Sequence, residues 1–148
     1  MQIRIATLGD LDGIHEVERV SFNDPWSMDS FSNELTNAMT TYLVAEEDGD
    51  ILGFVGMWEV LGEGQITNVA VHTKARRRGI GQALIEALID YSKAKNLEVL
   101  ILEVRESNEA AKALYSLNGF KVIGERKNYY TQPTEDALLM ALSLEVGE

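Results

Sequence analysis

The sequence feature that most constrains the fold is a short basic loop, Arg76–Gly81 (RRRGIG), which joins a strand-like run to a helix-like run. The preceding segment, Gln65–His72, alternates and is rich in β-branched residues, whereas Gln82–Lys95 carries apolar residues at helical spacing. A strand that enters a helix through such a loop presents unpaired backbone N–H groups at the positive end of the helix dipole. The loop therefore predicts a binding site for a phosphate group.

The rest of the chain divides into short strands and helices, with no repeat, low-complexity segment or linker between domains. We expect strands over Gln2–Ala6, Thr41–Glu47, Ile51–Val60, Gln65–His72, Glu98–Val104, Phe120–Lys127 and Asp136–Leu144, and helices from Thr7 to about Val20, from Ser27 to about Thr36, over Gln82–Lys95 and from Asn108 to Leu117. Turns are expected at Asp48–Asp50 and Gly62–Gly64.

This order, β-α-α-β-β-β-α-β-α-β-β, predicts a single α/β domain over residues 1–148, in which helices cover a mixed sheet. The crossover from Gln65 to Val104 should be right-handed. Its single strand–helix–strand unit offers too little alternation for a dinucleotide-binding fold.

The charge of the chain is distributed unevenly. Residues 1–64 hold 13 acidic and 2 basic side chains, a balance of −11, whereas residues 65–148 hold 11 of each. Affinity for nucleic acid needs a broad positive surface, so DNA and RNA are not expected as partners. The acidic half would suit a cationic substrate, or it would serve solubility alone.

Composition limits the chemistry and the location further. No apolar run approaches the ~18 residues of a membrane span, and the first ten residues lack the apolar core of a signal peptide, so we expect a cytoplasmic protein with no membrane partner. The chain has no cysteine, which excludes a disulfide framework and a cysteinyl acyl-enzyme. His15 and His72 are too few for a convincing metal cluster, and His72 is given no catalytic role. A monomer is compatible with the sequence.

The basic loop is neither a GxGxxG fingerprint nor a Walker A loop. Its pattern, Arg76-x-x-Gly79-x-Gly81, resembles the pyrophosphate-binding motif of the GNAT superfamily of acetyl-CoA-dependent N-acetyltransferases, and the element order matches over essentially the whole chain. Four further segments resemble the RimI family, the bacterial enzymes that acetylate the N-terminal alanine of a small-subunit ribosomal protein. These segments are Ser21–Ser27, Asn118–Phe120, Asn128–Tyr130 and Glu135–Met140. The resemblance implies that acetyl-CoA is the cosubstrate and a ribosomal protein N-terminus the acceptor.

The resemblance also implies where acetyl-CoA binds. The backbone of Val69, Ala70 and Val71 would pair with the pantetheine amides, and its N–H groups would hold the thioester carbonyl as an oxyanion hole does. The pyrophosphate would lie on the loop and the helix start, which comprise Arg76, Arg77, Arg78, Gly79, Ile80, Gly81 and Gln82. Glycine allows the backbone to approach a phosphate and arginine adds positive charge, although a tight turn with solvated arginines would have the same sequence.

Three residues of the second half are implied to act on the reacting groups. Glu103 interrupts an apolar strand and would be the general base that takes the proton of the amine; its alternative is an ion pair with Arg105 or a place at the strand edge. Tyr115 would protonate the departing thiolate, and its alternative is a core aromatic. Asn108, two helical turns before Tyr115, would contact the cofactor, cap the helix, or do both.

Aromatic residues are the candidates for binding the acceptor. Trp26 lies in a proline-containing loop, and Tyr129 and Tyr130 are expected to follow the end of a strand. Aromatics with polar tips suit a groove that holds a peptide N-terminus, and they also suit simple packing. In an extended chain the two tyrosines would point in opposite directions.

Two other functions remain open at this level. The same chemistry could act on another amine, such as a lysine side chain, a polyamine or an aminoglycoside. The chain could also bind acetyl-CoA without catalysis, although Glu103, Asn108 and Tyr115 argue for an active enzyme.

Overall fold

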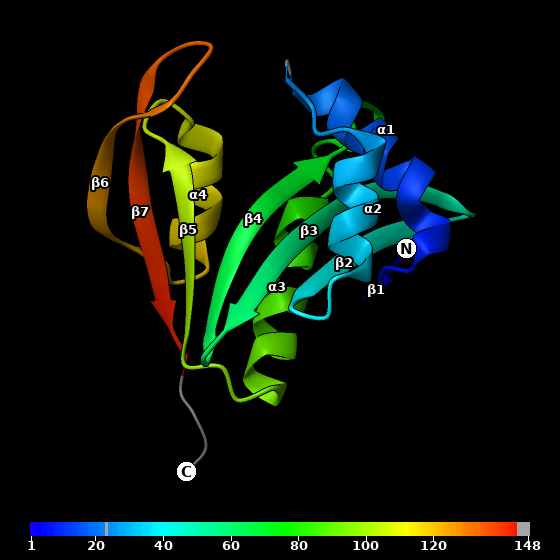
Figure 1. Ribbon diagram of the computed structural model, residues 1–148, viewed down its shortest axis with the longest axis horizontal. Coiled ribbons are helices and arrows are strands. Elements are labelled where there is room, and N and C mark those ends of the chain that lie inside the picture. The colour runs from blue at the N-terminus through cyan, green and yellow to red at the C-terminus, as the bar shows by residue number, and fades with distance from the viewer. Residues whose placement is uncertain (23, 145–148) are drawn as a thin grey trace.

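The computed structural model describes residues 1–22 and 24–144, so Asn23 of the Ser21–Ser27 segment lies outside the described residues. The strands form one seven-stranded sheet in the order β1-β2-β3-β4-β5-β7-β6 (Figure 1). The strands are β1 (Gln2–Ile5), β2 (Thr40–Glu47), β3 (Asp50–Val60), β4 (Glu63–Val71), β5 (Val99–Arg105), β6 (Lys121–Tyr130) and β7 (Glu135–Ser143). The helices are α1 (Leu11–Ser21), α2 (Met28–Thr36), α3 (Ile80–Ala94) and α4 (Glu109–Leu117), with 3-10 turns at Leu8–Asp10 and Thr73–Ala75.

The predicted element order and the mixed α/β sheet are confirmed. The expected turn at Gly62–Gly64 is wrong, because the hairpin turns at Leu61 and Gly62, whose φ angles are +52° and +83°. A two-residue loop of type I′ needs positive φ at both positions, which Gly62 adopts without strain. Gly64 instead lies inside β4, where an added Cβ would come within 2.6 Å of Leu100.

Several further boundaries differ from the prediction, and the first α-helix begins at Leu11, after a 3-10 turn, rather than at Thr7. Helix α3 begins at Ile80 rather than Gln82, because Gly79 takes a left-handed φ of +75° and caps the helix. Strand β4 covers Glu63–Val71 rather than Gln65–His72. Strand β6 covers Lys121–Tyr130 rather than Phe120–Lys127, so the paired tyrosines end the strand instead of following it.

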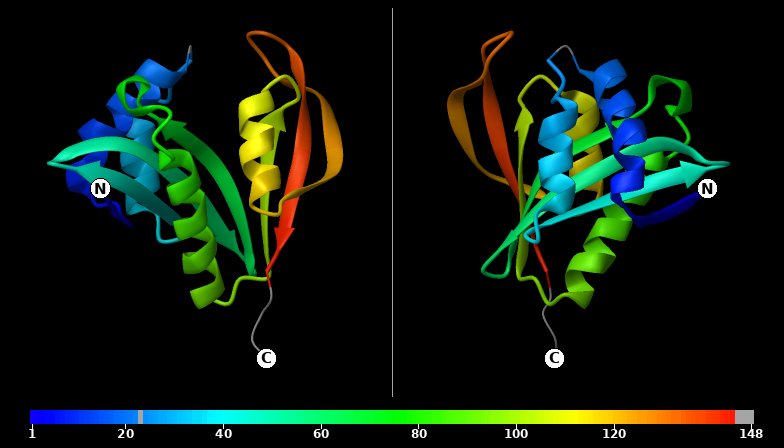
Figure 2. Two further views of the ribbon diagram at one scale, coloured as in Figure 1. Left: turned by 180° about the vertical axis from the view of Figure 1, so that it is seen from behind. Right: turned by 45° about the vertical axis from the view of Figure 1, so that its right-hand side comes forward.

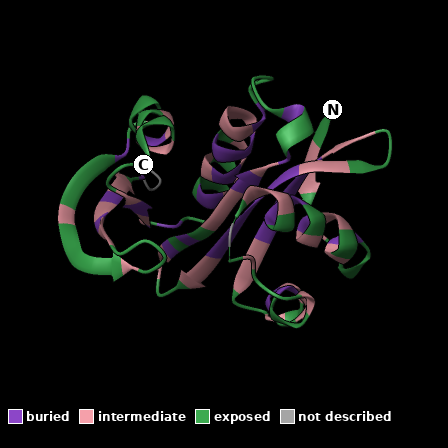
Figure 3. Ribbon diagram, turned by 90° about the horizontal axis from the view of Figure 1, so that it is seen from above, coloured by how far each residue is buried: buried purple, intermediate pink, exposed green. Residues whose placement is uncertain are grey.

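Helices cover both faces of the sheet. Helices α1 and α2 lie on one face of β2–β4, and α3 and α4 lie on the opposite side (Figure 2). Beneath α1 and α2 a small core gathers around Ile14, Phe31 and Phe54, whereas the larger core contains Leu84, Leu88, Leu100, Leu102 and Tyr115. The edge strand β6 is mostly exposed (Figure 3). No helix among residues 1–22 and 24–144 is long and apolar enough to cross a bilayer.

The sheet separates into two parts between its only parallel neighbours among the described strands. Strands β4 and β5 pair from Glu63↔Val99 to Ile66↔Leu102 and no further. On the other side of β4, Gly56 faces Asn68 and Met57 faces Ile66, so Thr67 is an extra, bulged residue. A bulge bends its strand and increases the local twist. Beyond it β4 continues with β3 while β5 continues with β7, and the two strands diverge (Figure 1).

Candidate active site

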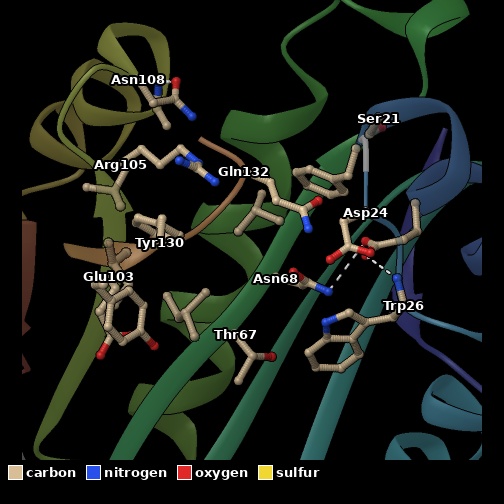
Figure 4. A pocket seen from close by; sticks show the side chains of 18 of the residues that line it. Ser21, Asp24, Trp26, Thr67, Asn68, Glu103, Arg105, Asn108, Tyr130 and Gln132 are labelled. Carbon is tan, nitrogen blue, oxygen red and sulfur yellow. Dashed lines mark hydrogen bonds between the residues drawn. The ribbon is translucent and has the colours of Figure 1, made fainter. Parts of the chain in front are cut away.

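A cleft of about 600 Å³ fills the space between the diverging strands. Its walls come from the C-terminal parts of β4 and β5, the segment between α1 and α2, helix α4, and the hairpin between β6 and β7 (Figure 4). Five of the residues predicted from the sequence as catalytic or acceptor-binding line this cleft. They are Trp26, Glu103, Tyr115, Tyr129 and Tyr130.

The β4 wall presents a strand edge that β5 has left. Strand β3 pairs with this part of β4, through Val55↔Val69, Phe54↔Ala70 and Gly53↔Val71. Strand β5 does not pair with these residues, so strand pairing covers only one edge of their backbone. The Val71 carbonyl also accepts long hydrogen bonds from Ser21 Oγ and Arg76 Nε, each at 3.4 Å. The free edge from Val69 to Val71 can therefore accept an extended ligand as an additional strand.

The basic loop follows β4 directly and leads into α3. Arg77 and Gly79 have left-handed φ angles of +66° and +75°, and an added Cβ on Gly79 would meet nothing within 4 Å. The first backbone bond of the helix runs from the Ala83 N–H to the Gly79 carbonyl at 3.0 Å. A helix start of this kind directs its first N–H groups outward, which fits an anionic group such as a pyrophosphate.

The side chains of this loop are not equally available. Arg76 and Arg77 are exposed, whereas Arg78 donates two hydrogen bonds to the Glu47 carboxylate at 2.8 and 2.9 Å. Gln82 forms a reciprocal amide pair with Asn118, with both contacts at 2.9 Å, and so fastens α3 to the end of α4. We therefore expect Gln82 to contribute its backbone, and any phosphate to compete with the Glu47 carboxylate for the Arg78 guanidinium.

Glu103 lies on β5 and faces the cleft, with 28% of its side chain exposed. Its Oε1 lies 3.6 Å from Nε of Arg126 on β6. The alternative of an ion pair with Arg105 is wrong, because Arg105 donates to the carbonyls of Thr131 and Pro133 at 3.0 and 2.9 Å and to Glu135 at 3.2 Å. A half-exposed carboxylate at the mouth of a cleft can accept a proton directly or through water.

Tyr115 and Asn108 both reach the cleft from α4, as their spacing of two turns predicts. Tyr115 is 8% exposed and its ring lies 5.8 Å from that of Phe120. Burial, and then the neighbouring Tyr130, raise the pKa of Tyr115 to about 12. Asn108 caps α4, since its Oδ1 accepts the Ala111 N–H at 3.1 Å. Tyr115 is thus both a packed aromatic and a hydroxyl donor that stays protonated.

The aromatic candidates form two opposite walls of the cleft. The Trp26 ring packs on Phe31 with 5.5 Å between centroids, while Tyr129 and Tyr130 lie edge to face at 5.0 Å. Both tyrosines line the cleft, which the extended-chain argument did not predict. The reason is a register shift of β6 between Arg126 and Tyr130, where Asn128 takes a φ of +51°.

The sequence argument missed two polar residues on the α1–β4 side of the cleft, Glu18 and Asn68. Glu18 is 2% exposed and accepts hydrogen bonds from the Trp26 N–H at 3.0 Å and from Asn68 Nδ2 at 3.4 Å. The sequence did contain a signal for Glu18, because it lies four residues after Ile14 and one after Val17 on the apolar face of α1. A carboxylate on that face must be buried with partners.

Neither histidine reaches the cleft. His72 Nδ1 accepts a hydrogen bond from the Lys74 N–H at 3.1 Å, and its Nε2 lies 3.5 Å from the Glu16 carboxylate. These contacts give His72 a structural role. Within residues 1–22 and 24–144, no three histidine or acidic side chains come together in a group that could hold a metal ion.

Comparison with known proteins gives the class of the molecule. The sequence profile of the acetyltransferase (GNAT) family matches residues 11–120. The chain therefore belongs to this family of acetyl-CoA-dependent acetyltransferases.

Two individual relatives of the chain are similar over nearly its whole length. Over 143 residues the chain is 41% identical to a Bacillus subtilis (strain 168) protein provisionally named [ribosomal protein bS18]-alanine N-acetyltransferase, which covers 96% of this chain and 95% of that protein. It is 36% identical over 137 residues to the [ribosomal protein bS18]-alanine N-acetyltransferase of Escherichia coli (strain K12), covering 91% of this chain and 92% of the relative.

Solved structures agree with this comparison. The crystal structure of the ribosomal-protein-S18-alanine N-acetyltransferase from Escherichia coli superimposes with a TM-score of 0.93 at 34% identity, over 99% of this chain and 96% of that one. NAA60 of Arabidopsis thaliana, solved with a bisubstrate analogue, shares the fold with a TM-score of 0.86 at 20% identity, over 99% of each chain.

Proposed function

We propose that this enzyme transfers the acetyl group of acetyl-CoA to the α-amino group of an N-terminal alanine in a small-subunit ribosomal protein. The observation that carries the proposal is one cleft in which Glu103 and Tyr115 lie beside the free edge of β4, with Trp26 and the paired tyrosines forming its walls. The names of the relatives suggest the acceptor, bS18. A cytoplasmic location belongs to the same proposal, since the acceptor is a ribosomal protein.

The roles of the cofactor-binding residues follow from their positions. The N–H groups at the start of α3 would hold the pyrophosphate, and Arg76 and Arg77 would add charge. The edge from Val69 to Val71 would pair with the pantetheine arm. An N–H of this edge directed at the thioester oxygen would stabilise the negative charge that develops during attack.

The chemistry is a direct transfer. The uncharged amine attacks the thioester carbonyl and forms the new C–N bond, Glu103 accepts the proton of the amine, and the C–S bond breaks as Tyr115 protonates the CoA thiolate. An α-amino group has an ordinary pKa of about 7.7–8.0, so a substantial fraction is already uncharged near neutral pH. Holding the amine beside the carbonyl should account for most of the acceleration, with proton transfer contributing about 10²–10⁴-fold.

A panel of short peptides tests the acceptor. Peptides that begin with Ala, Ser, Gly or Met are incubated with acetyl-CoA and the enzyme, and the acetylated atom is located by fragment mass spectrometry. We expect α-amino acetylation of the alanine peptide, and no product from an N-blocked, lysine-containing counterpart. Acetylation of the blocked peptide would assign the enzyme to side-chain amines, and release of CoA without any acetylated peptide would contradict a peptide acceptor.

A further inference from the structure

Glu18 is a buried carboxylate that the reaction described above does not use. It lies on α1 and is 2% exposed, yet it lines the cleft. Burial raises its pKa, and the hydrogen bond from the Trp26 N–H opposes this effect. A carboxylate taken out of water is costly unless donors satisfy it, so its position requires the two partners that it has.

The two donors to Glu18 come from different elements. The Trp26 N–H belongs to the segment between α1 and α2, and its bond to Oε2 measures 3.0 Å. The Asn68 Nδ2 belongs to β4, one residue beyond the bulge at Thr67, and lies 3.4 Å from Oε1. Figure 4 draws both hydrogen bonds as dashed lines, one from Asn68 and one from Trp26, that converge on one carboxylate. Glu18 thus ties the Trp26 segment to the strand that borders the reaction site.

This contact also determines how the Asn68 amide faces the cleft. With Nδ2 turned toward Glu18, the Oδ1 of Asn68 points toward the β5 side of the open cleft (Figure 4). A carbonyl oxygen accepts hydrogen bonds and donates none, so in this position it suits a donor group of the acceptor. An incoming amine, or the first peptide N–H behind it, is such a donor.

We propose that Glu18 is a positioning residue for the acceptor, which holds the Trp26 wall in place and orients Asn68 to present its carbonyl oxygen to an acceptor N–H. The proposal rests on the proposed function in one respect, that the acceptor enters between Trp26 and β4. Glu18 itself touches neither the acceptor nor acetyl-CoA. It acts through Trp26 and Asn68.

The chain contains a matched control for this proposal. Glu34 on α2 is also buried, at 8% exposure, and also accepts two hydrogen bonds, from Tyr42 OH at 3.2 Å and Trp58 Nε1 at 3.1 Å. Glu34 does not line the cleft. A glutamine at either position loses the charge. The two donors to Glu34 bond the same oxygen, Oε1, whereas those to Glu18 bond different oxygens, so only Glu18→Gln also opposes an N–H₂ group to a donor and disturbs a wall of the cleft.

Steady-state kinetics of Glu18→Gln, Glu34→Gln and Asn68→Ala test the proposal, with whichever peptide the wild-type enzyme acetylates as acceptor. We expect Glu18→Gln and Asn68→Ala each to raise KM for the acceptor about tenfold, the effect of one lost hydrogen bond, with KM for acetyl-CoA changed less than about twofold. Glu34→Gln should lower Tm and leave both KM values unchanged. The double variant Glu18→Gln/Asn68→Ala should be no worse than Glu18→Gln alone, because the part of the effect that Asn68 carries depends on its contact with Glu18.

Two results would overturn the proposal. One is an equal rise of both KM values in Glu18→Gln, which is the mark of general loosening. The other is additive effects of Glu18→Gln and Asn68→Ala on the acceptor KM. If Glu18→Gln does not fold, Asn68→Ala alone decides, since an unchanged acceptor KM in that variant contradicts the assigned role. A wild-type enzyme that prefers lysine peptides would overturn the proposed acceptor and leave this comparison intact.

Discussion

The Glu103 carboxylate lies 3.6 Å from Arg126 Nε, and this contact reaches across a whole strand. Strand β7 lies between β5 and β6, and its Leu139 faces Glu103 on one side and Gly124 on the other. Arg126 is 56% exposed, and exposed ion pairs contribute little to stability because water screens them. The contact therefore orients the proposed base without fixing it, which leaves the carboxylate able to approach an incoming amine.

Glu103→Gln removes the proposed base without changing the size of the side chain. We expect kcat to fall by about 10²-fold or more, and the pH dependence of kcat to shift, because the amine then loses its proton without the carboxylate. The release of free CoA thiol, measured across a pH series, gives both quantities. An unchanged profile would remove Glu103 from this role.

Tyr115→Phe removes the proposed acid and keeps the packing on Phe120. Because burial raises the pKa of Tyr115 to about 12, its hydroxyl stays protonated at every pH below about 11. We therefore expect kcat to fall by about 10²-fold at all working pH values, with the acidic limb retained. Thermal denaturation serves as the control for folding, and a variant with full kcat would show that Tyr115 only packs.

Gly79→Ala tests the basic loop. Alanine at a φ of +75° costs about 1–2 kcal/mol, although its Cβ would meet no atom within 4 Å. We expect KM for acetyl-CoA to rise several-fold because the N–H groups at the start of α3 shift. Gly49→Ala is the matched control, since Gly49 has a φ of +87° and equally open surroundings in the β2–β3 turn. A similar KM in the two variants would argue against the phosphate site.

Arg105→Met tests the hairpin that carries Tyr130. Arg105 holds this hairpin through the Thr131 and Pro133 carbonyls, and its guanidinium lies 4.4 Å from the centre of the Tyr130 ring. Without these contacts we expect faster amide hydrogen exchange over residues 130–135 and a several-fold rise in KM for the acceptor. Normal exchange together with normal kinetics would contradict the prediction.

Asp10→Asn tests an ion pair distant from the cleft. The Asp10 carboxylate accepts two hydrogen bonds from Arg4 and one from the Thr7 N–H, each at 2.8 Å, and the Arg4 bond is the main reason that its pKa is lowered. A group with a lowered pKa in the folded state contributes stability above its unfolded pKa, about 3.9, and loses that contribution as pH falls through the folded value.

Urea denaturation of wild type and Asp10→Asn measures this effect. We expect the wild type to be more stable by about 1–3 kcal/mol at pH 7, and the difference to shrink below about pH 3.9. A difference that stays constant down to pH 2 would show that Asp10 acts by shape rather than by charge.

Much of the fold was predictable because its signals are local. The alternation of Gln65–His72, the helical spacing after Gly81 and the Asp48-Gly49 turn each depend on neighbouring residues, and the structure places strands, a helix and a hairpin there. Boundaries were missed by one to four residues, in two places because glycine conformation decided them. The hairpin turn includes Gly62, and α3 is capped by Gly79.

The site was only partly predictable. The family motif located Glu103, Tyr115 and Trp26, and all three line one cleft. The sequence offered an ion pair with Arg105 as the alternative role of Glu103, but the observed contact is with Arg126, and it depends on where the β6–β7 hairpin folds back. Tyr129 and Tyr130 share a wall because β6 shifts register just before them. Such pairings join residues far apart in the chain, and no local pattern encodes them.

The sequence by itself determined the order of the elements, the place of the glycine-bearing Arg76–Gly81 loop between a strand and a helix, and the side chains available for catalysis, because these follow from periodicity, turn chemistry and residue type. The tertiary structure alone decided that β4 and β5 part after Ile66 and Leu102, and that Glu18 is buried against Trp26 and Asn68. The bulge at Thr67 turns β4 away from β5 only when β3 holds it on the other side. A cleft between two strands is a property of their pairing partners, and those partners meet only in the folded chain.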